Sequence, residues 1–173
     1  RAEVLQQIKN NPKQLVITYP EALSEQVLTP KELQRKTLAI KKGDELSIDF
    51  VNETLFDFGF KRVDFVSEPG EFAVRGGILD VHSYSHDEPF RIEFFGDEID
   101  TIRSFDITSQ RSTQALETIH VLANIEQKEV DEKRQSLLSF ISKNSIVCIQ
   151  NASVITASLD KLFAHAETSY TEL

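Results

Sequence analysis

The sequence predicts a mixed fold, in which an α+β module with an antiparallel sheet lies between two pieces of α/β character. Three observations predict it. Short apolar strands and helices alternate near both ends of the chain, an order typical of α/β proteins. The middle instead has one amphipathic helix followed by several short β segments separated by turns. Acidic charge is concentrated there, because residues 37–112 hold 16 acidic and 8 basic residues. We therefore expect three parts, at residues 1–35, 36–112 and 113–173.

The first part is predicted from helical and β patterns in turn. Val4, Leu5 and Ile8 have helical spacing and predict a helix over 3–9. The apolar run at 15–18 predicts a short buried strand. Pro20 is then typical of the first turn of a new helix.

The central module is predicted to begin with a strand at 37–40 and a turn at 41–44. Ser47 is a suitable N-cap for a helix over 48–58, and Gly59 lies just past its end. That helix carries one apolar stripe. The β segments that follow are predicted at 62–66, 71–75, 78–82, 90–95 and 99–105.

The last part is predicted to return to α/β character. We expect an extended strand at 117–122, a helix at 129–141 and an apolar strand at 145–150. Asn151 is a candidate N-cap for a final helix. Cys148 lies inside the apolar run and is expected to be a buried, inert thiol.

Composition excludes several classes of protein. The chain has 173 residues, a net charge of -9 and one cysteine, so it has no internal disulfide. No run of about 18 apolar residues predicts a membrane span, and the first residues show no signal segment. We expect a cytoplasmic protein without a membrane partner. The sequence contains no Met, so we also expect a piece of a longer protein.

The acidic middle is unlike a nucleic-acid-binding surface, because it would repel a phosphate backbone. Two interpretations remain. The charge alone favours a solubilising surface. The alternative is an acidic module that meets a basic protein partner.

The most informative pattern surrounds Gly96-Asp97, which separates two alternating runs. It predicts a two-residue hairpin with Gly first, as a type II′ turn prefers. Phe94 should then face Ile99. In the same register, Glu93 should face Asp100 as a destabilising pair of like charges.

Alternation also divides the first strand of this hairpin into two faces. The apolar residues of even number are expected to face the core, whereas Arg91, Glu93 and Phe95 share the other face. Arginine and aromatic residues on one exposed face are typical of a binding hot spot. Pattern alone favours a different interpretation, in which Arg91 forms an internal ion pair and Phe95 lies under a loop.

Other residues with chemical potential are mostly better explained by structure. Gly76-Gly77 interrupts a strand pattern and predicts a bulge or a bend, and a bulge would re-aim Arg75. A phosphate-binding loop is disfavoured there, because the spacing differs and no helix follows. The potential metal ligands between Asp80 and Glu88, with His82 and His86 among them, are interpreted as a solvated loop. We expect no metal, no cofactor and no catalytic residue.

Three motifs together resemble a known family. They are Glu-Pro-Gly-Glu-Phe-Ala-Val-Arg-Gly-Gly-Ile-Leu-Asp from Glu68, Phe-Arg-Ile-Glu-Phe-Phe-Gly-Asp-Glu-Ile-Asp from Phe90, and Arg-Ser-Phe-Asp followed by Ser-Gln-Arg-Ser up to Ser112. The block resembles the amino-terminal, UvrB-like region of bacterial transcription-repair coupling factors (Mfd). Without its ending it is similar to domain 2 of the excinuclease protein UvrB. Gln110-Arg111 favours the coupling factors, whereas His82-Ser83 departs from the Phe-Pro that the family often has.

The resemblance implies a fold and a function. Residues 36–112 would be a second domain, inserted into a first, RecA-like domain whose partial pieces are 1–35 and 113–173. This second domain would bind the excinuclease protein UvrA and so recruit nucleotide excision repair to stalled RNA polymerase. The family's binding residues fall on Arg75, Arg91 and Phe95, with Glu93 at the matching acidic position.

The resemblance also implies what this fragment lacks. The parent factor would be an ATP-dependent DNA translocase, and it would contact RNA polymerase and DNA only through regions absent from this chain. Other domains of the parent factor would cover the binding face until a repair complex assembles. We expect the fragment itself not to hydrolyse ATP.

Two alternatives stay open. A UvrB-like fragment for DNA damage verification would bind DNA in a salt-dependent manner, which the acidic middle opposes. A hydrolase using the cluster at 80–88 would bind a metal tightly and lose it on His82→Ala.

Overall fold

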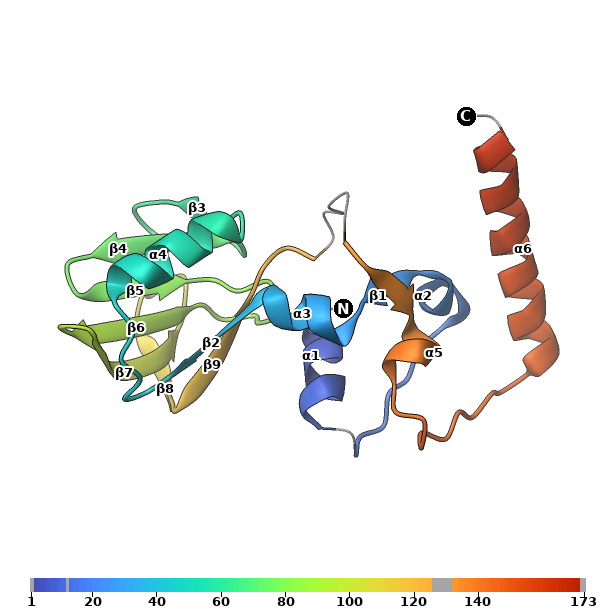
Figure 1. The fold of residues 1–173 in the computed structure, drawn as a ribbon, viewed down its shortest axis with the longest axis horizontal. Helices are drawn as coiled ribbons and strands as arrows, with labels where there is room; N and C mark the ends of the chain where they lie inside the picture. The colour runs from blue at the N-terminus through green and yellow to red at the C-terminus, as the bar shows by residue number, and fades with distance from the viewer. Residues whose placement is uncertain (1, 12, 126–131, 172–173) are drawn as a thin grey trace.

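The computed structural model describes residues 2–11, 13–125 and 132–171. A sheet with one helix lies at one end of the molecule, and several short helices with the long helix α6 (Ala152–Thr171) lie at the other (Figure 1). The paired strands β2 (Thr37–Lys41) and β9 (Thr118–Leu122) run between these two parts. No helix in the described ranges is long and apolar enough to cross a membrane.

The main sheet has six strands in sequence order, which are β3 (Lys61–Arg62), β4 (Glu71–Arg75), β5 (Ile78–Val81), β6 (Phe90–Phe95), β7 (Glu98–Phe105) and β8 (Ser112–Leu116). All neighbours pair antiparallel except β3 and β4. The mixed α+β fold with antiparallel sheets is therefore confirmed. Two-residue turns join β4 to β5 and β6 to β7, which makes the strands of each pair neighbours in the sheet.

Helix α4 (Ile48–Asp57) covers one face of this sheet (Figure 1). The Ser47 side chain accepts a hydrogen bond from the backbone N–H of Phe50, as an N-cap does. Val51 and Leu55 are fully buried and pack against the sheet. Gly59 follows the helix with a positive φ of 77°, so both predicted ends are confirmed.

A second, smaller core lies on the opposite face of the sheet. It contains Val66, Ala73 and Phe105, and the loop after β3 covers it. The Glu71 carboxylate accepts hydrogen bonds from the backbone N–H groups of Ser67 and Glu68 and closes this loop. These bonds, the one from Ser67 first, hold the pKa of Glu71 below its ordinary value although burial opposes them.

The other end of the molecule contains the remaining elements. They are α1 (Ala2–Asn10), α2 (Pro20–Ser24), β1 (Gln26–Leu28), α3 (Pro30–Arg35), β10 (Arg134–Ser136), α5 (Leu137–Phe140) and α6 (Ala152–Thr171). Strands β1 and β10 pair antiparallel. The buried Glu132 carboxylate forms an ion pair of 2.9 Å with Lys36 and one of 2.6 Å with Arg134. Burial raises the pKa of Glu132, but these partners outweigh it and lower the pKa overall.

Several expectations in the flanking parts are wrong. Residues 15–18 and 145–150 form no strand, and Leu15, Ile17 and Ile146 are each about nine-tenths exposed. Cys148 is accordingly exposed rather than buried. An apolar run becomes a strand only when a neighbouring strand pairs with it, and the described residues offer none here. The expected helix at 129–141 shrinks to 137–140, with a strand before it, and residues 129–131 lie outside the described ranges.

One turn and one strand register differ from their predictions. Gly76-Gly77 is the two-residue turn between β4 and β5 rather than a bulge within a strand, because Arg75 pairs with Ile78. The turn at Gly96-Asp97 is confirmed, and Phe94 faces Ile99 as expected. A bulge in β7 then adds one residue, so Glu93 faces Thr101 and not Asp100. The expected repulsion is thereby avoided.

Candidate protein-binding face

Asp80 is the buried centre of a three-residue ion cluster on the sheet face opposite α4. Its side chain is 1% exposed. Arg91 faces it on β6, with Nε donating to Oδ1 at 2.7 Å and Nη2 to Oδ2 at 2.9 Å. Arg75 on β4 also donates from Nη2 to Oδ2. We name Arg75, Asp80 and Arg91 the arginine clamp; it carries a net charge of +1.

Each guanidinium of the clamp has further contacts besides its bond to Asp80. The guanidinium of Arg91 lies 4.5 Å above the Phe105 ring, and its Nη1 donates to the Gln110 carbonyl at 3.4 Å. The hydrogen bonds to Asp80 raise the pKa of Arg91 further, so it is always charged. The guanidinium of Arg75 lies 5.4 Å from the centre of the Phe65 ring. The two groups are therefore fixed by hydrogen bonds and by aromatic stacking.

Both arginines keep N–H groups for a ligand. A guanidinium has five N–H donors. Arg91 uses Nε, one N–H of Nη1 and one of Nη2, whereas Arg75 uses one N–H of each Nη. The Arg91 side chain is 18% exposed and that of Arg75 is 39% exposed. The clamp can therefore donate to an anion from outside without giving up its internal bonds.

Glu93 and Phe95 lie further along β6. Glu93 accepts a hydrogen bond of 2.8 Å from the Thr101 hydroxyl and one of 3.4 Å from Arg103 Nη2. Phe95, next to the hairpin turn, is 82% exposed. The internal ion pair expected for Arg91 on pattern alone is thus confirmed. The expectation that Phe95 lies under a loop is wrong.

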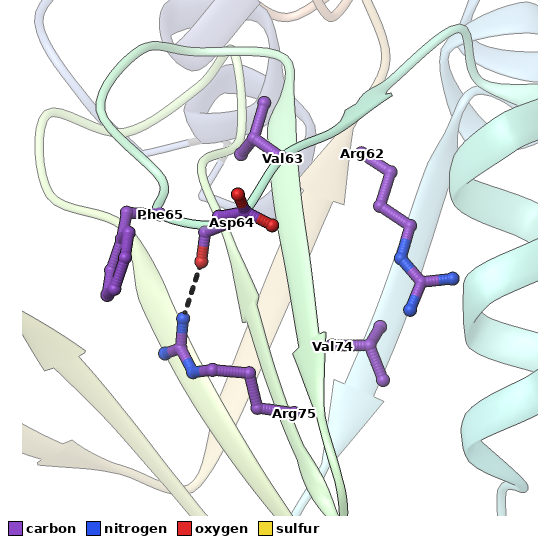
Figure 2. Close-up of a pocket in the computed structure, with 6 residues that line it drawn as sticks. All are labelled: Arg62, Val63, Asp64, Phe65, Val74 and Arg75. Atoms are coloured by element: carbon purple, nitrogen blue, oxygen red, sulfur yellow. Dashed lines mark hydrogen bonds between the residues drawn. The ribbon is translucent and has the colours of Figure 1, made fainter.

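A pocket of about 510 Å³ adjoins the clamp at Arg75. Figure 2 shows Arg75 reaching toward Phe65 and donating to the Asp64 carbonyl at 2.8 Å, while the Val74 side chain points the other way, toward Arg62. Arg62 lines the same pocket. Phe65 is 68% exposed, so the pocket adds a second exposed aromatic ring to this side of the molecule.

The residues from Asp80 to Glu88 do not form the expected solvated loop. His82, Ser83 and Ser85 are buried, and the Ser83 hydroxyl accepts a hydrogen bond of 2.9 Å from the backbone N–H of Leu122. Burial lowers the pKa of His82 and of His86. Within the described ranges, no group of three or more His, Cys, Asp or Glu residues is placed to hold a metal ion. The segment instead ties the sheet to β9.

The part of the chain that carries this face matches a known protein family. A family model described as the UvrB interaction domain matches residues 38–126, just over half of the chain. The chain belongs to the UvrB interaction domain family. The matched region contains all of the arginine clamp, the pocket and the hairpin with Phe95.

Several relatives of this UvrB interaction domain chain share one name. Proteins called transcription-repair-coupling factor from Haemophilus influenzae, Bacillus subtilis and Escherichia coli are 38%, 35% and 36% identical to it over 122 residues. These matches cover 70% of the chain but only 10–11% of each relative. The chain spans about a tenth of the length of these relatives. The resemblance to coupling factors that the motifs indicate is confirmed.

The structure adds residues to the four that the motifs point to. Asp80 is one, since the sequence suggests it only as a metal ligand. Its register opposite Arg91 depends on the pairing of β5 with β6, which the sequence does not specify. Gln110 is another, because a left-handed backbone with φ of 59° turns its carbonyl toward Arg91. Gln110 belongs to the motif that favours the coupling factors.

Proposed function

We propose that this chain is a protein-recruitment module of a transcription-coupled nucleotide excision repair factor, and that it binds UvrA through Arg75, Arg91, Glu93 and Phe95. The observation that carries the proposal is an exposed phenylalanine on the same strand as Arg91, which Asp80 holds beside the partly exposed Arg75 of β4. Membership in the UvrB interaction domain family supports it. The four residues have different roles.

Arg75 and Arg91 donate charge-assisted hydrogen bonds to carboxylates of the partner. Phe95 is the apolar anchor, since burying an aromatic ring removes about 150–250 Å² from water. Glu93 orients a cation of the partner. Its present cation, Arg103, is half-exposed and contacts it at 3.4 Å, so a partner group can replace or join it.

We assign binding, not catalysis, to this chain. Its domain 2, residues 36–112, carries the face, and residues 1–35 with 113–173 are two pieces of a first, RecA-like domain. The exposed apolar runs at 15–18 and 145–149 support a larger first domain, because such runs are normally covered in a complete fold. Other domains of the parent factor cover the face until repair proteins assemble.

DNA binding is the weaker alternative. The proposed face belongs to the segment with 16 acidic and 8 basic residues, which repels a phosphate backbone. The clamp adds only one net positive charge. A protein partner with carboxylates and an apolar recess fits this face better than a polyanion does.

A pull-down with immobilised UvrA tests the proposal. The wild-type chain should be retained, and Arg75→Ala, Arg91→Ala and Phe95→Ala should each reduce retention strongly. Lys143→Ala removes a surface cation that the motifs do not include and is the matched control. Wild-type retention of all three face variants would refute the proposed face.

A further inference from the structure

We propose that Asp80 is a positioning residue for partner binding, which holds Arg75 and Arg91 so that N–H groups of both converge on one carboxylate of the partner. This inference rests on the proposed function and adds the device that prepares the binding face. Asp80 cannot contact the partner itself, because its side chain is 1% exposed. It acts through the two arginines.

A single oxygen of Asp80 brings the two guanidiniums together. Oδ2 accepts a hydrogen bond from Nη2 of Arg75 and from Nη2 of Arg91. Both Nη2 atoms therefore lie within hydrogen-bond distance of one atom, although their charges repel. Each Nη2 keeps a second N–H that the described contacts do not use. Without the Asp80 charge, nothing in the clamp offsets the repulsion between the two arginines.

The outer parts of both side chains are fixed as well. The Asp64 carbonyl holds Arg75 and the Gln110 carbonyl holds Arg91, while Phe65 and Phe105 lie against the two guanidiniums. Such contacts beyond the shared oxygen are unusual for two surface arginines, whose long side chains normally sample many rotamers. The conformational entropy of the Arg75 and Arg91 side chains is lost when the chain folds, so partner binding does not have to restrict these side chains again.

The charge of the clamp limits the ligand that it takes. Two guanidiniums and one carboxylate leave a single net positive charge, which matches one carboxylate rather than a cluster of them. Phe95 lies on the same face of β6 as Arg91. The clamp therefore fits a partner segment with one acidic side chain next to an apolar recess.

Calorimetric titration of UvrA with variants of the whole chain tests this role. Asp80→Asn keeps the side-chain shape and removes the charge, and we expect binding about tenfold weaker or more, because the preorganised geometry is lost. The matched control is Asp64→Asn, which removes the same charge from an exposed side chain beside the clamp and should change binding by less than about twofold. Unchanged or tighter binding by Asp80→Asn would overturn the inference.

A double-mutant cycle separates positioning from general damage to the fold. If Asp80 acts through the arginines, then Asp80→Asn should weaken binding little in a chain that already carries Arg75→Ala and Arg91→Ala. Equal loss in both backgrounds would show a merely structural role. If Arg75→Ala and Arg91→Ala together leave binding unchanged, the proposed function fails. If these two substitutions weaken binding but Asp80→Asn does not, only the positioning role of Asp80 is overturned.

The wild-type chain offers a readout that does not require the variant to fold. Side-chain ¹⁵N NMR spectra should show slow rotation about Nε–Cζ, with separate Nη signals, for Arg75 and Arg91. Arg62 lines the neighbouring pocket with an exposed side chain and makes no contact of this kind with the described residues, so it should show averaged signals. Averaged signals for Arg75 and Arg91 would contradict the clamp.

Discussion

Replacing Arg91 with alanine should destabilise the fold, and the structure allows the size of the effect to be worked out. The substitution removes two hydrogen bonds to a carboxylate that is 1% exposed. Breaking a buried ion pair by removing one partner costs about 3–5 kcal/mol. Arg75 stays on Asp80, which favours the lower end of that range. The lost contact of the guanidinium with the Phe105 ring adds about 0.5–1 kcal/mol.

We therefore expect Arg91→Ala to lower the free energy of unfolding by about 3–4 kcal/mol. Urea denaturation followed by far-UV circular dichroism measures it. With a slope of about 2 kcal/mol/M, the midpoint should fall by about 1.5–2 M. The matched control is Arg103→Ala on the next strand, whose ion pair with Glu93 is 3.4 Å long and partly exposed, so it should cost at most about 1 kcal/mol. Equal midpoint shifts for the two variants would refute the reasoning.

Two further predictions concern stability away from the arginines. Burial lowers the pKa of three histidines below the ordinary value of 6.5, namely His82, His86 and His120. The unfolded chain therefore binds more protons than the folded chain below pH 6.5. The melting temperature should be constant with respect to these histidines above pH 6.5 and should fall as the pH drops below 6.5. Replacing all three histidines with Gln should make the melting temperature depend less on pH. Gly70→Ala should cost about 2–3 kcal/mol in urea denaturation, because φ is 88° and a Cβ would overlap the Tyr84 hydroxyl. Gly43→Ala, with φ of 83° and open space, should cost only about 1 kcal/mol, and equal costs would contradict the overlap.

Local signals predicted the central module well. The Ser47 cap, the helix after it and Gly59 at its end are set by neighbouring residues, so the sequence specifies them. The strands at 71–75 and 90–95 match their expected bounds, because alternation and turn residues fix both ends. The same signals placed Arg91, Glu93 and Phe95 along one face of β6.

Contacts between distant segments were harder to predict. The bulge in β7 shifts Glu93 from Asp100 to Thr101, and no residue of the hairpin signals it. The role of Asp80 depends on the register of β5 with both β4 and β6. A sequence motif describes one strand at a time, so it does not reveal this role. The runs at 15–18 and 145–150 have the composition of strands. A strand also needs a neighbouring strand to pair with, and the described residues offer no such neighbour to either run.

The affinity of the Phe95→Ala variant for UvrA tests the central claim most directly. Phe95 is 82% exposed, so its loss should leave the fold intact and any change belongs to binding. Phe163 is 72% exposed on α6, a helix at the opposite end of the molecule from β6 in Figure 1, and it supplies the matched control Phe163→Ala. In calorimetric titrations we expect Phe95→Ala to weaken binding by about 2 kcal/mol, roughly thirtyfold, and Phe163→Ala to bind as the wild type does. Wild-type affinity of Phe95→Ala would contradict the account.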